Sequence, residues 1–245
     1  MLGKPAAMLI LVLGAMSIPA GPAGRPFVVV LDPGHGGTNM GAAGAVEGVY
    51  EKRLTLVLAR AVASRLEATP GVVVVLTRDD DRFLTLRERA RRANAVGADV
   101  FVSIHANASP TRTQRGLETW VLTPDALDID APALRAADGP WRPGLDPDTA
   151  ALLDDVERGT SLPGAVRLAG LMEAHLHAAR SDSPDRGVRQ GSLDVLLGPT
   201  MPAVLVEVGF IDHPVEGVEL LRRDVRAATA DAIAGAILEY RGGVE

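Results

Sequence analysis

The sequence contains no cysteine, which excludes disulfide bonds and thiolate metal ligands from the folded chain. Any metal site must therefore be built from histidines and carboxylates. An excess of positive charge is also missing, because 25 Lys and Arg residues face 31 Asp and Glu residues, for a formal net charge of -6. Binding to DNA or RNA needs concentrated Lys and Arg to displace counterions from phosphates, so we expect no nucleic-acid partner.

The sequence near the N-terminus has no apolar run long enough to span a membrane. The apolar run there, from about residue 6 to residue 18, is shorter than the roughly 20 residues that a membrane-spanning helix needs. Lys4 precedes it, and small residues and prolines follow it, with Ala20 or Ala23 placed to end a cleavage site. We predict that residues 1–23 are a signal peptide and that the protein is exported to the periplasm, the cell envelope or the medium. An uncleaved segment that anchors the protein to the membrane is the alternative.

What is present indicates a folded domain, because the chain is 47% hydrophobic and 23% charged and its 245 residues suit one domain. We predict an α/β fold over residues 26–242, a single domain with a largely parallel twisted sheet flanked by helices. Four Val-rich runs are apolar throughout, as strands buried on both faces are, and a fifth run alternates more and belongs nearer an edge. The four runs are residues 27–32, 72–77, 99–105 and 202–210, and the fifth is 116–122.

Helical patterns separate these runs. The first helix has apolar residues at steps of three and four, and the second starts with Thr85 and Glu88 in a capping-box arrangement. A stretch rich in Pro, Asp and Ala, residues 123–161, interrupts the rhythm of strands and helices. We expect it to be a surface insertion with a short helix at 148–159, and a lid over the active site is the alternative. The main helices are predicted at residues 50–68, 85–97, 163–180 and 224–240.

Groups that bind metals or move protons follow three of the predicted strands. His35 follows the first strand, His105 ends the third, and Glu207 lies near the end of the last, while Glu51 begins the first helix. In an open α/β sheet, functional groups gather at the carboxyl ends of the strands. Four such groups at one edge would suit a zinc ion with one open coordination position.

The chemistry favours three ligands and one base. Two neutral imidazoles and one carboxylate, from His35, His105 and Glu51, leave Zn²⁺ with a net positive charge that acidifies a water molecule. Glu207 is embedded in an apolar strand, where an unpaired carboxylate is costly, so a raised pKa and a role as general base and then general acid would explain its presence. Taken alone, His35 could be an ordinary loop residue, and Glu51 could simply complement the helix dipole.

Other histidines and other catalytic motifs fit less well. His175 and His177 are two residues apart on a predicted helix, point about 200° apart and cannot easily share an ion, while His213 is expected near the pocket rim. The glycines around His35 form neither a dinucleotide-binding fingerprint nor a Walker loop. The sequence also contains no H-E-x-x-H and no G-x-S-x-G motif.

Seven motifs in a fixed order resemble the zinc-dependent N-acetylmuramoyl-L-alanine amidases of bacterial cell walls, the Amidase_3 type, over residues 26–240. The motifs are VVVLDPGHGG, YEK, LTRDDD, LRERARRANAVGADVFVSIHANA, GLETWVL, DRGVRQ and PAVLVEVGFIDHP. The resemblance implies that His35, Glu51 and His105 bind Zn²⁺ and that Glu207 is the catalytic acid and base. It also implies hydrolysis of the amide between N-acetylmuramic acid and L-alanine in peptidoglycan, for wall remodelling or separation of daughter cells.

The resemblance leaves regulation and some alternatives open. Some relatives carry a helix that blocks the zinc site until a protein activator displaces it, and residues 123–161, with Asp154, Asp155 and Glu157, would be the corresponding segment here. A zinc peptidase that cuts within the stem peptide is an alternative function. A catalytically inactive relative that binds wall fragments is another, although all four site residues are present. We expect a monomer.

Overall fold

A computed structural model describes residues 24–123 and 144–244. The predicted signal peptide and the first part of the predicted insertion, residues 124–143, lie outside the described residues. In residues 24–123 and 144–244, no helix has both the length and the apolar character needed to cross a membrane.

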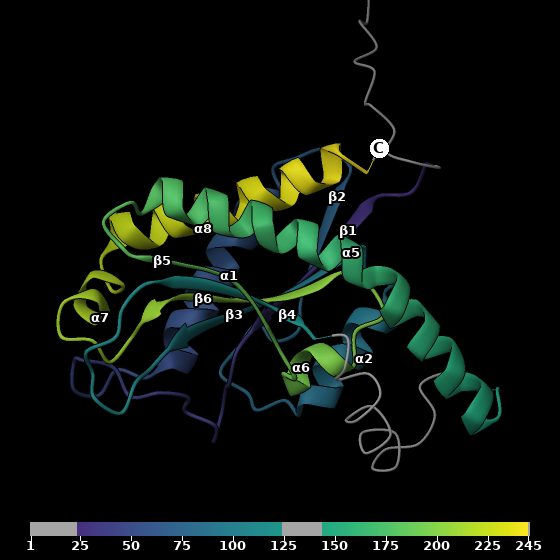
Figure 1. Cartoon of the computed structure of the whole chain (residues 1–245), viewed down its shortest axis with the longest axis horizontal. Coiled ribbons are helices and arrows are strands. Elements are labelled where there is room, and N and C mark those ends of the chain that lie inside the picture. Colours follow the sequence, from purple (N-terminus) through teal and green to yellow (C-terminus); the bar gives the residue numbers. More distant parts are fainter. Residues whose placement is uncertain (1–23, 124–143, 245) are drawn as a thin grey trace, which may run out of the picture.

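The described residues form one six-stranded mixed sheet with the order β2-β1-β3-β6-β4-β5 (Figure 1). Strands β2, β1, β3 and β6 are parallel to one another, whereas β4 is antiparallel to β6 and parallel to β5. The adjacent strands β1, β3 and β6 therefore end at the same edge. The strands are β1 (Phe27–Pro33), β2 (Val72–Leu76), β3 (Val100–Asn107), β4 (Leu117–Leu122), β5 (Asp185–Gly191) and β6 (Ala203–Phe210).

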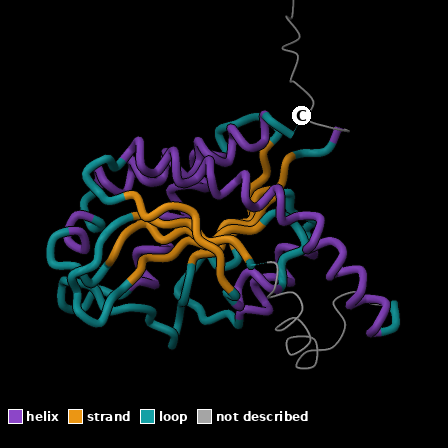
Figure 2. The backbone as a smooth tube through the Cα atoms, in the orientation of Figure 1, coloured by secondary structure: helices purple, strands orange, loops and turns teal. Residues whose placement is uncertain are grey.

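Helices cover both faces of this sheet and bury an apolar core on each (Figures 1 and 2). Helices α1, α5 and α8 pack on one face against alternate residues of the central strands, and α2 and α6 pack on the other. The short helix α7 follows β6. The helices are α1 (Glu51–Leu66), α2 (Leu86–Ala95), α5 (Pro147–Ala179), α6 (Asp194–Leu197), α7 (Glu216–Glu219) and α8 (Arg223–Gly242).

The predicted single α/β domain with a largely parallel sheet is confirmed, and the details of its two edges differ from the prediction. One edge strand is β2, which is not buried on both faces, because Val73 is 43% exposed. The other is β5, which we did not predict from its polar, glycine-containing sequence DRGVRQG. The strand predicted nearer an edge, β4, lies one position in from it.

The predicted insertion and the helix after it also differ from the structure. Helix α5 runs without a break through Pro163, so residues 147–161 are part of it and form no separate short helix. Proline favours the first turn of a helix, where its missing N–H costs nothing, so a helix that continues through Pro163 is not expected from local rules. Asp146 caps the actual start by accepting a hydrogen bond from the N–H of Thr149 at 2.9 Å.

Candidate metal and catalytic site

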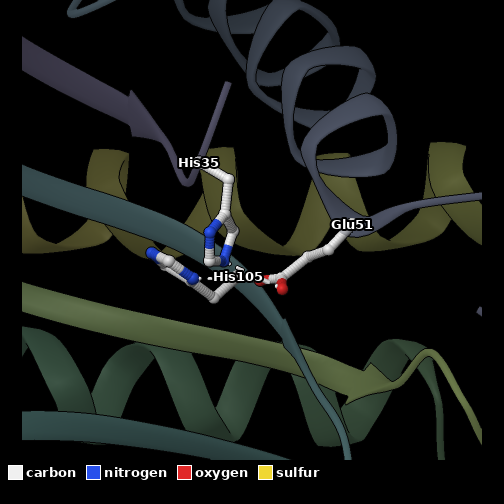
Figure 3. A group of neighbouring side chains, drawn as sticks. All are labelled: His35, Glu51 and His105. Carbon is white, nitrogen blue, oxygen red and sulfur yellow. Dashed lines mark hydrogen bonds and ion pairs between the residues drawn. The ribbon is translucent and has the colours of Figure 1, made fainter. Parts of the chain in front are cut away.

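The three predicted metal ligands meet at the carboxyl end of the parallel strands (Figure 3). His35 Nε2 lies 2.9 Å from Glu51 Oε2, and His105 Nδ1 lies 3.0 Å from Glu51 Oε1. One ligand atom from each residue lies within 4.8 Å of the other two. The two imidazole rings stand edge to face, with centroids 4.9 Å apart. Two nitrogen donors and one carboxylate thus converge on one point from β3, α1 and the loop after β1.

Glycines make this close approach sterically feasible. A Cβ at Gly34 would lie 2.4 Å from His105 Cε1, and a Cβ at Gly41 would lie 2.7 Å from Glu51 Oε2. His35 itself has φ +62°, a left-handed conformation that is uncommon for any residue with a side chain. The DPGHGG motif therefore serves two purposes, because it leaves space for the second histidine and turns the first one toward Glu51.

Two buried arginines hold the backbone of the His35 loop. The Arg89 guanidinium donates to the carbonyls of Pro33 at 2.8 Å and His35 at 2.7 Å, and it forms a 2.7 Å ion pair with Asp32. Arg78 donates to the carbonyls of Pro33 at 2.9 Å and Gly34 at 2.7 Å. We predicted no role for these residues from the sequence, although their motifs, LTRDDD and LRERA, are among those that resemble the amidases.

Glu51 is buried as an anion among donors. It is 4% exposed and accepts hydrogen bonds from the backbone N–H groups of Ala42 and Ala106, at 2.9 and 3.0 Å. Burial alone would raise its pKa, but the hydrogen bonds and charges of His105 and His35 outweigh burial and hold the pKa far below the ordinary value. Burial likewise works to lower the pKa of His35, and Glu51 raises it above the ordinary value. The site therefore favours a charged carboxylate with a cation next to it.

Glu207 lies directly beside this cluster. It is opposite His105 in the parallel ladder between β3 and β6 and opposite Glu118 in the antiparallel ladder between β6 and β4, so the three side chains share one face of the sheet. Its buried Oε2 atom has no hydrogen-bond partner among the described residues. Burial, together with the negative charges of Glu51 and Glu118, raises the pKa of Glu207 well above its ordinary value. Such a carboxyl group is suited to exchanging a proton near neutral pH.

The other histidines lie outside the cluster. His175 Nε2 pairs with Glu239 at 2.7 Å on the outer helices, and His177 is exposed at the end of α5. His213 Nδ1 accepts from the N–H groups of Val215 and Glu216 and so supports the start of α7. In the described part of the chain, the group of His35, Glu51 and His105 is the one arrangement of at least three such residues that could hold a metal ion.

An α/β domain with two histidines and a glutamate around one point, and a buried carboxyl group of raised pKa beside them, has the residue types that mononuclear metal hydrolases use. The chain belongs to the N-acetylmuramoyl-L-alanine amidase family, Amidase_3, whose model matches residues 29–239.

Known amidases resemble the chain in sequence and in structure. The amidase AmiC of Neisseria meningitidis serogroup B is 34% identical over 232 residues, which are 89% of this chain and 53% of that protein. AmiA of Escherichia coli K12 is 31% identical, over 89% of this chain and 77% of that protein. The crystal structure of an N-acetylmuramoyl-L-alanine amidase from Clostridium difficile 630 superposes with a TM-score of 0.69 at 29% identity, covering 88% of this chain and 97% of that one. The chain thus spans about half the length of the Neisseria relative.

Proposed function

We propose that the protein is a zinc-dependent N-acetylmuramoyl-L-alanine amidase that cleaves the amide between N-acetylmuramic acid and L-alanine in peptidoglycan, during wall remodelling or separation of daughter cells. The observation that carries the proposal is the convergence of His35, Glu51 and His105 with Glu207 opposite His105 on the neighbouring strand. Membership of the amidase family supports the choice of substrate.

The residues of the site fit a zinc ion. Two imidazoles and one carboxylate are a donor set that catalytic zinc sites use, and three protein ligands leave a position for water or substrate. Glu51 is buried, held as an anion and fixed by two backbone N–H groups, so it would compensate part of the charge of a divalent cation. His35 Nδ1 contacts Asn39 Oδ1 at 2.9 Å, which orients the ring and leaves Nε2 on the side of the cluster.

Glu207 would move the protons of the reaction. Bound zinc would supply Lewis-acid chemistry, polarising the scissile carbonyl and making a water molecule more acidic. The Glu207 carboxylate takes a proton from the attacking water as the new C–O bond forms, and gives it to the nitrogen of L-alanine as the C–N bond breaks. The products are a lactyl carboxylate on the glycan and a stem peptide with a free N-terminal amine. The unpartnered Oε2 atom of Glu207 is free for both transfers.

We also propose that the protein acts outside the cytoplasmic membrane. The substrate lies there, and the sequence of residues 1–23 has the charge and apolar pattern of a signal peptide.

The test is digestion of purified peptidoglycan by the zinc-loaded protein, with mass spectrometry of the soluble products. We expect intact stem peptides that begin with L-alanine, and we expect Glu207→Gln to release at least about 100-fold less while it binds zinc as the unaltered protein does. Fragments cut within the stem peptide would instead identify a peptidase. A Glu207→Gln variant as active as the unaltered protein would refute the role of Glu207.

A further inference from the structure

Two arginines of the edge strand β5 converge on one carboxylate next to Glu207. Arg186 Nε lies 2.6 Å from Glu118 Oε2, and Arg189 Nε lies 3.0 Å from the same oxygen. Glu118 is 2% exposed and opposes Glu207 in the ladder between β4 and β6. Glu118 thus accepts a hydrogen bond from Arg186 and lies within ion-pair distance of Arg189, which places both guanidinium groups on the Glu207 side of the sheet.

The group of Glu118, Arg186 and Arg189 has two positive charges and one negative charge. One arginine is sufficient to compensate one buried carboxylate, and Arg186 is the better placed, with a side chain that is 26% exposed and also contacts Gln114. The Arg189 side chain is 41% exposed. Among the described residues, Arg189 makes its ion pair with Glu118 through Nε, so its two terminal nitrogens have donors to spare. The group thus presents one surplus positive charge to solvent.

Trp120 packs beside the Arg189 guanidinium, which carries this surplus charge. Arg189 is the register partner of Trp120, and its guanidinium carbon lies 5.9 Å from the centre of the indole ring. The indole N–H donates to Glu118 Oε1 at 3.1 Å, and the ring packs over Gly191, where a Cβ would come within 2.9 Å of it. Cross-strand partners and alternate residues share a face, so Arg189, Trp120 and Glu118 lie on the same face as Glu207. A flat arginine held over an aromatic ring is preorganised for a carboxylate.

The distance also suits the substrate of the proposed function, on which this inference rests. Strand β5 lies two strands from β6, or about 10 Å, but the Arg189 guanidinium reaches back to Glu118 on β4, the strand next to β6. The second residue of the stem peptide is a glutamate joined through its side chain, so it offers a free α-carboxylate about two residues, or roughly 7 Å of extended chain, from the scissile bond. We propose that Arg189, supported by Glu118, Arg186 and Trp120, binds this carboxylate and so selects stem peptides in which it is free over those in which it is an amide.

The test compares two ligands that differ in one group, N-acetylmuramoyl-L-alanyl-D-isoglutamate and N-acetylmuramoyl-L-alanyl-D-isoglutamine. Their affinities for the zinc-loaded Glu207→Gln protein are measured by calorimetry, so that neither is cleaved. We expect the acid to bind roughly tenfold tighter than the amide, the typical effect of one charged hydrogen-bonded pair. Equal affinities, or no binding of either ligand, would overturn the inference, and this comparison needs no arginine variant to fold.

A second step assigns the preference to Arg189. The Arg189→Gln substitution is added to the same protein, in which Arg186 still compensates Glu118. We expect this substitution to weaken binding of the acid ligand, to leave binding of the amide ligand unchanged, and so to remove the preference. The control is Arg91→Gln on the exposed face of α2, which should keep the preference. A preference that survives Arg189→Gln would contradict the assignment. If peptidoglycan is not cleaved but the acid is still preferred, the proposed function fails while the carboxylate site stands.

Discussion

Arg89 connects the interior of the sheet to the loop that carries His35. Its side chain is 3% exposed, and its guanidinium is shared between the Asp32 carboxylate and the carbonyls of Pro33 and His35. Asp32 is completely buried and also accepts from Ser103 at 2.8 Å, so the ion pair belongs to a buried polar network under the loop. A network of this kind stabilises the chain only while all its members are present.

Replacing Arg89 should therefore cost more stability than an ordinary substitution. We expect Arg89→Ala to lower the free energy of unfolding by about 3–5 kcal/mol, because a buried Asp32 charge loses its partner. Urea unfolding of the metal-free protein measures this directly. The matched control is Arg91→Ala, two residues along α2 and exposed, which should change stability by less than about 0.5 kcal/mol. Similar losses for the two variants would mean that the network is not a structural support.

Gly34 tests the packing of the metal site. We expect Gly34→Ala to weaken zinc binding by roughly tenfold or more, because a new Cβ would overlap the His105 ring and overpacking costs about 1–3 kcal/mol. Competition with a chromophoric chelator measures the affinity. The control is Gly170→Ala in α5, where a Cβ meets nothing within 4 Å and alanine favours the helix. A Gly34→Ala protein that binds zinc normally would show that the ring can move aside.

At the scale of elements, helix α5 is attached to the antiparallel part of the sheet through a buried acid. Glu173 is 5% exposed and accepts from the Thr119 hydroxyl of β4 at 2.8 Å. Burial raises the pKa of Glu173 to about 7 from an ordinary 4.5; the Thr119 bond opposes the rise and the Asp185 carboxyl adds to it. The folded protein therefore holds a proton on Glu173 that the unfolded chain releases.

This attachment should make stability depend on pH. The stabilisation that protonated Glu173 gives the folded state is fully present below pH 4.5 and is lost as the pH rises through about 7. The reason is that Glu173 ionises at a lower pH in the unfolded chain than in the folded protein. We expect the free energy of unfolding of Glu173→Gln, relative to that of the unaltered protein, to be higher at pH 8 than at pH 5. The expected change is up to roughly 3 kcal/mol, from the difference in the pKa of Glu173 between the folded and unfolded states. Urea unfolding at both pH values checks this, with the exposed Glu67→Gln as control. An identical difference at both pH values would contradict a raised pKa.

The elements show where sequence reasoning succeeds. The central strands were predicted because Val-rich runs bounded by polar turns have few other structures open to them. Strand β5 was missed because an edge strand with one solvated side needs no apolar run, and residues 185–191 hold one valine. The extent of α5 was missed because a helix can continue through a proline at the loss of one backbone hydrogen bond, whereas a local rule places proline in the first turn.

Some residues of the site were likewise predicted from the sequence, and others were missed. His35, His105 and Glu207 were predicted to lie together because parallel neighbouring strands must end at one edge. The sequence did not assign roles to Arg89 or Arg189. The spacing of an arginine does not say which carbonyl or carboxylate it reaches across the fold, and both act through contacts between distant segments.

At the scale of the whole molecule, zinc should stabilise the folded chain, because the ligands come from three separate segments that are close together only when it is folded. At a free zinc concentration 100 times the Kd, we expect about 2.7 kcal/mol of added stability, measured by thermal unfolding with and without zinc. Replacing His105 with alanine should remove most of this gain. An equal rise in Tm for the His105→Ala protein would place the zinc elsewhere.

The most direct measurement is a zinc titration of the metal-free protein, with bound zinc and the rate of release of stem peptides from peptidoglycan followed in the same samples. We expect both to rise together, to saturate at one zinc per chain and to be lost in His35→Ala. Full activity without zinc, or zinc bound at this site with no release of L-alanine-terminated peptides at any loading, would refute the proposed zinc amidase.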